Sequence, residues 1–102
     1  MKIEFRSYDL AVEFYHLSRK IPCDRHLKEQ LLRAASSVAL NLAEGRGKKS
    51  FKDQARFFQI ALGSVRECQA ILILVNQEND ILSRKLDALG ASTFKLIRNS
   101  GA

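Results

Sequence analysis

The sequence has few of the residues that mark specialised classes of protein. Its 102 residues include one proline, five glycines, two cysteines and no tryptophan. So little proline and glycine, beside 46% hydrophobic residues, excludes a disordered tail and a collagen-like chain, and two cysteines are too few for a disulfide scaffold. We therefore expect one folded domain over residues 1–102, in which folding buries roughly two-thirds of the unfolded chain's surface.

Long apolar runs are also missing. The longest is Ala70–Val75, whereas a helix that crosses a bilayer needs about 20 apolar residues. The amino terminus, Met1–Arg6, has no apolar stretch of the kind that a secretory signal contains. We therefore expect no membrane segment and a cytoplasmic protein, in which Cys23 and Cys68 remain reduced.

Strand signals are absent too, because polar and apolar residues do not alternate and there is no Asn-Gly or Asp-Gly turn. Apolar residues recur instead at helical spacing. We predict helices over residues 7–20 with Ser7 as N-cap, from after Asp24 to a break at 45–49, over 50–77 with Ser50 as N-cap, and from after 79–80 to about 98. Short connections favour antiparallel neighbours, so the predicted fold is all-α, an up-down antiparallel four-helix bundle.

Two of the predicted helices have more apolar surface than a single core stripe requires. The third has two apolar faces, one of which begins at Phe51, and we interpret both mainly as core because two neighbours cover this helix. The second has a separate row of small and apolar residues away from its core stripe. With an aromatic residue from the last helix, this row forms our predicted subunit interface: Leu32, Ser36, Ala39, Ala43 and Phe94.

A polar stripe flanks the apolar face of the second predicted helix and meets polar residues on the third. The residues are Arg33, Ser37, Asn41, Glu44, Ser64 and Glu67. We predict an Arg33–Glu67 ion pair and interpret the set as a hydrogen-bond network that fixes the register of the two helices. A binding pocket or catalytic carboxylate pair is the alternative, but no His, Ser-His or Cys-His group accompanies these carboxylates.

Metal and cofactor sites lack the residues that they need. Cys23 and His26 have Cys-x-x-His spacing, but no second pair of ligands lies at a suitable distance, which argues against zinc. The segment 45–50 resembles a phosphate-binding loop only superficially, because it is too short and follows a helix. We expect no metal, no cofactor and no catalytic residue, and therefore no enzymatic activity.

Acidic residues are outnumbered, and the imbalance is local. The chain has 17 Lys and Arg against 11 Asp and Glu, a net charge of +6, and residues 46–56 hold five cations and one acid. Cations continue along the third predicted helix for about 20 Å. The predicted contacts to a nucleic-acid backbone are Arg46, Lys48, Lys49, Lys52, Arg56 and Arg66. A solvated face without a partner fits the charge equally well, and no aromatic platform for stacking RNA bases is evident.

Two segments resemble a known family. The runs RAASSVALNLAEG, residues 33–45, and IALGSVRE, residues 60–67, are similar in residue type and spacing to the signature of the four-helix-bundle proteins first noticed in intervening sequences of bacterial 23S ribosomal RNA genes. The resemblance implies an up-down bundle and a homopentameric ring. It also implies relatives such as the basic accessory protein of diversity-generating retroelements, which works with a reverse transcriptase and nucleic acid.

Charge and resemblance together suggest two functions. The first is a non-enzymatic oligomeric bundle that binds RNA or DNA through backbone charge, as an accessory or scaffold protein. The second is a protein-interaction module, in which the charge serves only solubility. By the family's pattern the shared polar and glycine positions, which include Gly45 and Gly63, serve the architecture rather than an active site.

Overall fold

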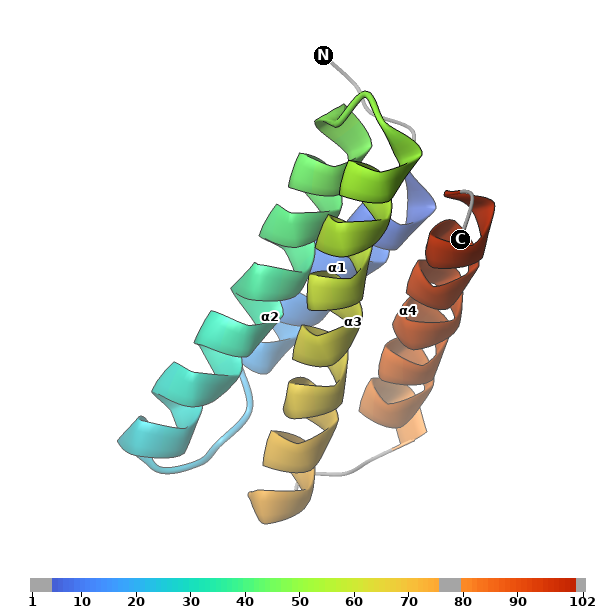
Figure 1. Cartoon of the computed structure of the whole chain (residues 1–102). Coiled ribbons are helices and arrows are strands. Elements are labelled where there is room, and N and C mark those ends of the chain that lie inside the picture. Colours follow the sequence, from blue (N-terminus) through green and yellow to red (C-terminus); the bar gives the residue numbers. More distant parts are fainter. Residues whose placement is uncertain (1–4, 76–79, 101–102) are drawn as a thin grey trace.

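Four helices run alternately up and down and enclose a shared core (Figure 1). The computed structural model describes residues 5–75 and 80–100. The helices are α1 (Arg6–Ser18), α2 (Arg25–Gly47), α3 (Phe51–Leu74) and α4 (Asp80–Asn99). Each packs against two others, since α1 contacts α2 and α4 while α3 contacts α2 and α4, and the α2–α3 interface is the most extensive. The predicted all-α four-helix bundle is confirmed.

Two helix starts follow directly from the local sequence. The side chain of Asp24 accepts a hydrogen bond from the backbone N–H of Leu27 at 2.9 Å, so Asp24 caps α2. The hydroxyl of Ser50 accepts one from the N–H of Asp53 at 3.1 Å and caps α3. The carboxylate of Asp53 also lies in the first turn of α3, where the helix dipole favours negative charge. The predicted N-cap Ser50 and the predicted start of α2 after Asp24 are confirmed.

Two predicted boundaries are wrong. α1 begins at Arg6, and Ser7 is not its N-cap but a buried residue of the first turn, whose hydroxyl bonds that of Ser92 on α4. α2 continues through the predicted break to Gly47, because Gly45 keeps a helical conformation. α3 ends at Leu74, and the predicted end near residue 77 lies outside the described residues.

All four helices contribute side chains to one apolar core. Its largest fully buried members include Phe14, Leu31 and Leu86. Two buried hydroxyls satisfy themselves locally: Ser18 donates to the carbonyl of Phe14 at 2.8 Å, and Thr93 donates to that of Leu89 at 2.7 Å. No buried side-chain nitrogen or oxygen of the described residues lacks a hydrogen-bond partner, so the core carries no desolvation penalty from unpaired polar atoms.

α3 is the most apolar helix of the bundle. By length and composition alone it is long enough to cross a membrane, with a mean hydropathy of 1.4 over an 18-residue window. The core helix of a bundle passes the same test, and α3 packs against both α2 and α4. The hydropathy of α3 is therefore weak evidence for a membrane span.

α2 and α3 approach each other very closely at Gly45. A Cβ atom on this residue would lie 2.6 Å from Cε1 and 2.8 Å from Cδ1 of Phe58, and 3.2 Å from Cβ of Phe57. The Phe58 ring is buried in the core, so displacing it would disturb the packing of its neighbours. Gly45 is therefore needed because only a residue without a side chain lets the last turns of α2 touch α3.

We predict that Gly45→Ala lowers the free energy of unfolding by about 1–3 kcal/mol, because the added methyl group overpacks the contact with Phe58. This loss should appear although alanine is the better helix former. Gly47→Ala is the matched control, since a Cβ atom there meets nothing within 4 Å. Urea unfolding followed by circular dichroism measures both, and equal stability of the two variants would contradict the close approach.

Candidate functional site

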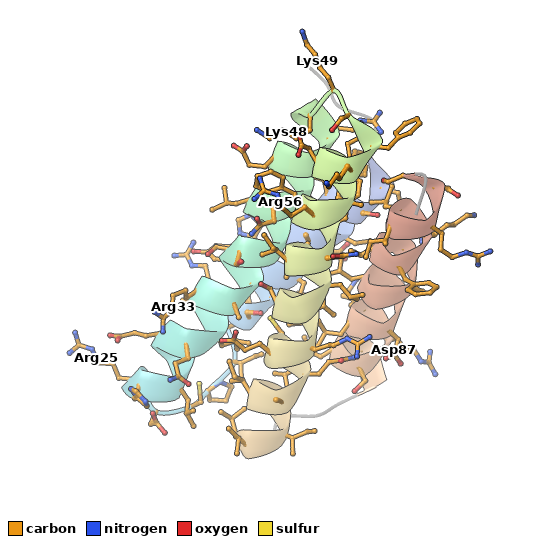
Figure 2. The ribbon with its side chains drawn as sticks, viewed as in Figure 1. Arg25, Arg33, Lys48, Lys49, Arg56 and Asp87 are labelled. Atoms are coloured by element: carbon orange, nitrogen blue, oxygen red, sulfur yellow. The ribbon has the colours of Figure 1, made fainter. Side chains whose placement is uncertain are left out.

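The topology collects cationic residues at one end of the bundle. The start of α1, the end of α2, the start of α3 and the end of α4 meet there (Figure 1), and Lys48 and Lys49 lie at its tip with Arg56 below them on α3 (Figure 2). We call this the basic end and define it by Arg6, Arg46, Lys48, Lys49, Lys52, Arg56 and Arg98, of which all but the half-buried Lys48 are exposed. Arg66, also predicted for this site, is exposed but lies farther along α3.

Sequence reasoning missed two members of the basic end, Arg6 and Arg98. They are far from residues 46–56 in sequence and carry no local pattern. The signal that could have found them is the topology itself, because an up-down bundle places the first turn of α1 and the last turn of α4 beside the α2–α3 turn.

Three of these cations contact the face of an aromatic ring. The guanidinium of Arg46 lies 4.9 Å from the ring centroid of Phe5. The ring of Phe57 has the ammonium of Lys48 at 5.1 Å and the guanidinium of Arg56 at 4.9 Å from its centroid. Such cation–π contacts are worth about 0.5–1 kcal/mol at exposed sites, so they favour a fixed placement of charge at the basic end.

The connection between α2 and α3 is short and hydrogen-bonded. It has only three residues, 48–50. The backbone N–H of Lys48 donates to the carbonyl of Gly45 at 3.2 Å, and the side-chain amide of Gln54 donates to the carbonyl of Lys48 at 2.9 Å. With the Ser50 cap on α3, these bonds hold the turn that carries Lys48 and Lys49.

Neighbouring acids neutralise little of the charge at the basic end. Lys48 pairs with Glu44 at 3.7 Å, while Lys49 and Lys52 form no ion pair with any described residue. At the opposite end Arg25 pairs with Glu29, and Lys85 pairs with Glu13. The basic end therefore keeps exposed cations that are available to an external anion.

Two hollows open at the basic end. A cavity of about 440 Å³, which we call the α3 cavity, lies beside the start of α3 and is lined in part by Lys52, Arg56 and Gln59. A smaller cavity of about 240 Å³ is lined in part by Arg46 and Asn99. The larger hollow falls within the size range of small-molecule sites, roughly 300–1,000 Å³.

A polar seam joins α2 and α3 away from the basic end. The hydroxyls of Ser37 and Ser64 are 2.8 Å apart and hydrogen-bonded. The amide nitrogen of Asn41 donates to the carbonyl of Ser37 at 2.8 Å and to its hydroxyl at 3.1 Å. The half-buried Ser37–Ser64 bond places residue 37 opposite residue 64 and helps to set the antiparallel register, whereas the Asn41 bonds stay within α2 and hold the Ser37 hydroxyl.

The predicted Arg33–Glu67 ion pair is wrong. Both side chains are exposed, and the ion pairs among described residues include neither. Arg33 lies on the side of α2 that faces away from α3 (Figure 2), and Glu44 contacts Lys48 rather than the seam. The physical reason is that water solvates both charges, while an exposed pair gains little and must hold two long side chains in place.

We predict that Asn41→Ala costs about 1 kcal/mol of unfolding free energy, because it removes two half-buried hydrogen bonds. Glu67→Ala should change it by less than about 0.5 kcal/mol, since this carboxylate is exposed and unpaired. Chemical unfolding of the two variants beside the parent protein measures the difference. A larger loss for Glu67→Ala than for Asn41→Ala would show that the carboxylate has a buried partner.

Both cysteines are free thiols, and neither belongs to a metal-ligand group among the described residues. Burial, reinforced by the negative charge of Glu67, raises the pKa of the Cys68 thiol to about 12, so this thiol stays protonated at neutral pH. Cys23 is half-buried between α1 and α2. Within residues 5–75 and 80–100 no three His, Cys, Asp or Glu side chains are grouped to hold a metal ion.

The predicted interface row on α2 is partly covered within the chain. Ala43 is exposed, but Leu32, Ser36 and Ala39 are half-buried, and Ala39 packs against the core. Phe94 on α4 is exposed as predicted from its place off the apolar face.

The most exposed apolar side chain of α2 is one that the sequence analysis did not single out. Leu40 is 65% exposed, and Ile60 on α3 is 46% exposed. Because residue 37 lies opposite residue 64, residues 40 and 60 lie at the same level across the seam. We call these two side chains the Leu40–Ile60 patch.

One family comparison covers nearly the whole chain. The family described as 23S rRNA-intervening sequence protein matches residues 1–99, a range that includes all four helices. Its matched range contains both segments on which the resemblance rests, residues 33–45 and 60–67. None of the curated proteins matches the chain. With the four-helix bundle described above, this match shows that the chain belongs to the 23S rRNA-intervening sequence protein family.

Proposed function

We propose that this protein is a non-enzymatic, oligomeric accessory or scaffold protein that binds the backbone of RNA or DNA through its basic end. The observation that carries the proposal is the set of exposed cations that four helices bring to one end, with Lys49 and Lys52 free of ion pairs among the described residues. An accessory role beside a nucleic-acid enzyme, as the resemblance implies, is part of this proposal.

Phosphate contacts give such binding a physical signature. Each phosphate that a Lys or Arg neutralises releases condensed counterions, so the logarithm of affinity falls linearly with the logarithm of salt concentration, by about 0.9 per contact on duplex DNA. With about four to six contacts, affinity falls by about 10- to 40-fold for each doubling of salt. Binding of this kind depends on charge and is independent of base sequence.

We predict that the double variant Lys49→Glu, Lys52→Glu binds RNA and DNA more weakly and lowers the slope of log affinity against log salt by about 2. The matched control is Arg19→Glu, Lys20→Glu, which changes the net charge equally but at the opposite end, where both side chains are exposed. Fluorescence anisotropy with labelled oligonucleotides at several salt concentrations gives both slopes.

Two results would overturn the proposal. One is the absence of measurable binding at low salt, and the other is an equal loss of affinity in the two double variants. The second result would show that overall charge, rather than the basic end, attracts the nucleic acid.

The Leu40–Ile60 patch favours a second candidate function, a contact with another protein chain. Exposed large apolar side chains beside half-buried polar groups are typical of protein interfaces. Leu40 and Ile60 belong to the two segments of the family resemblance, one to each. A second copy of this chain is the partner that the proposed oligomer requires. The predicted row on α2 and Phe94 are the alternative surfaces for this contact.

We predict that size-exclusion chromatography with light scattering gives a mass several times that of one chain. Leu40→Glu should reduce it to the mass of one chain, because it buries a charge in the interface. Ala43→Glu, on the row predicted from sequence, tests the alternative surface with the same charge. A mass of one chain for the parent protein would contradict self-association and leave contact with a different protein as the explanation for the patch.

A further inference from the structure

An exposed aromatic ring adjoins the basic end. Phe51 is the first residue of α3 and is 62% exposed, although its place in an apolar pattern predicts a core residue. It lines the α3 cavity together with Lys52 and Arg56. A large apolar ring without cover, in a hollow that also holds cations, has no role in the core and is available to a ligand with a flat apolar face.

Resting on the proposed function, we infer that the nucleic acid bound at the basic end is single-stranded, with one base stacked on Phe51 in the α3 cavity. Base stacking on aromatic side chains beside a positively charged surface is the common physical basis of single-strand binding. A duplex turns its base faces inward against one another and cannot offer one to Phe51.

The cations are arranged so that phosphates can lie at the rim of the cavity. Lys52 follows Phe51 directly and Lys49 precedes it by two residues, and both are exposed and without ion pairs among the described residues. Arg56, one turn along α3, contacts the ring of Phe57. Lys52 and Arg56 therefore share the lining of the α3 cavity with Phe51, and Lys49 lies two residues before it in the chain.

The cavity offers polar groups to a base as well as cations to its phosphates. Gln59 offers both hydrogen-bond donors and an acceptor, and the carboxylate of Asp53 offers only acceptors. An exocyclic amino group of a base can donate to Asp53, while Lys52 and Arg56, which line the same cavity, attract the phosphates of the strand. A base stacked on Phe51 can therefore bind these polar groups while its phosphates lie near the cations.

A single tryptophan at residue 51 can report on this arrangement. It has no tryptophan, so Phe51→Trp introduces a single fluorophore at the proposed stacking position. Adding a single-stranded oligonucleotide should quench this fluorescence, and the corresponding duplex should leave it nearly unchanged. Phe51→Ala should weaken single-strand binding by about 5- to 150-fold, the range of one lost base stack, and should leave duplex binding unaltered.

Two matched variants separate stacking from general effects. Phe51→Leu keeps an apolar side chain but removes the aromatic face, so it should lose affinity as Phe51→Ala does. Ile81→Ala removes a comparably exposed apolar side chain, 66% exposed, from the start of α4 outside the α3 cavity and should retain the parent affinity. Because Phe51 is largely exposed, these variants should stay folded, which circular dichroism verifies.

The outcomes distinguish this inference from the function on which it rests. If single strands and duplexes bind equally and Phe51→Ala binds as the parent does, the inference is wrong while backbone binding stands. If neither nucleic acid binds at low salt, the proposed function is wrong, and the inference that rests on it is wrong as well. If Phe51→Trp responds to an acidic peptide or to vesicles of anionic lipid but not to the oligonucleotide, the inference is wrong, and the anisotropy measurement alone decides the proposed function.

Discussion

The close approach of α2 to α3 at Gly45 is the constraint on which the rest of the structure depends. Because no side chain separates the two helices there, Phe58 can fill the core beneath the turn and Phe57 can stay between Lys48 and Arg56. Farther along, the hydrogen bond between Ser37 and Ser64 joins the same two helices, and Asn41 donates to the Ser37 hydroxyl from within α2. Steric contact at one end and polar contacts along the seam thus fix one register, and that register sets where the charges lie.

The helices could be predicted because their determinants are local. Helical spacing of apolar residues gave all four, and Asp24 and Ser50 marked two starts through side-chain caps that need only three neighbouring residues. The failures depend on distant partners. In the sequence, Gly45 looks like the end of a helix because glycine often ends helices. In the structure, glycine is needed there because the ring of Phe58 on α3 leaves no room for a side chain. Ser7 looks like a cap, whereas its hydroxyl bonds Ser92 on α4.

The candidate site was predictable in part for the same reason. The cations of residues 46–56 are contiguous, so composition alone locates them. Arg6 and Arg98 lie beside them only because the topology brings the ends of the four helices together. Phe51 is exposed because the first residue of α3 lies beyond the end of the core, which its apolar pattern does not reveal. The Arg33–Glu67 pair was wrong because helical spacing gives the neighbourhood of a side chain but does not decide whether it turns to a partner or to water.

The short connection between α2 and α3 has a consequence for the energetics of recognition. A long flexible loop that carries lysines must lose conformational entropy when a ligand orders it, and that loss subtracts from affinity. Here the turn of residues 48–50 is already held by backbone, hydroxyl and amide hydrogen bonds. Any anion that reaches this tip meets a preorganised backbone, so binding costs the rotamer entropy of the lysine side chains but little entropy of the turn itself.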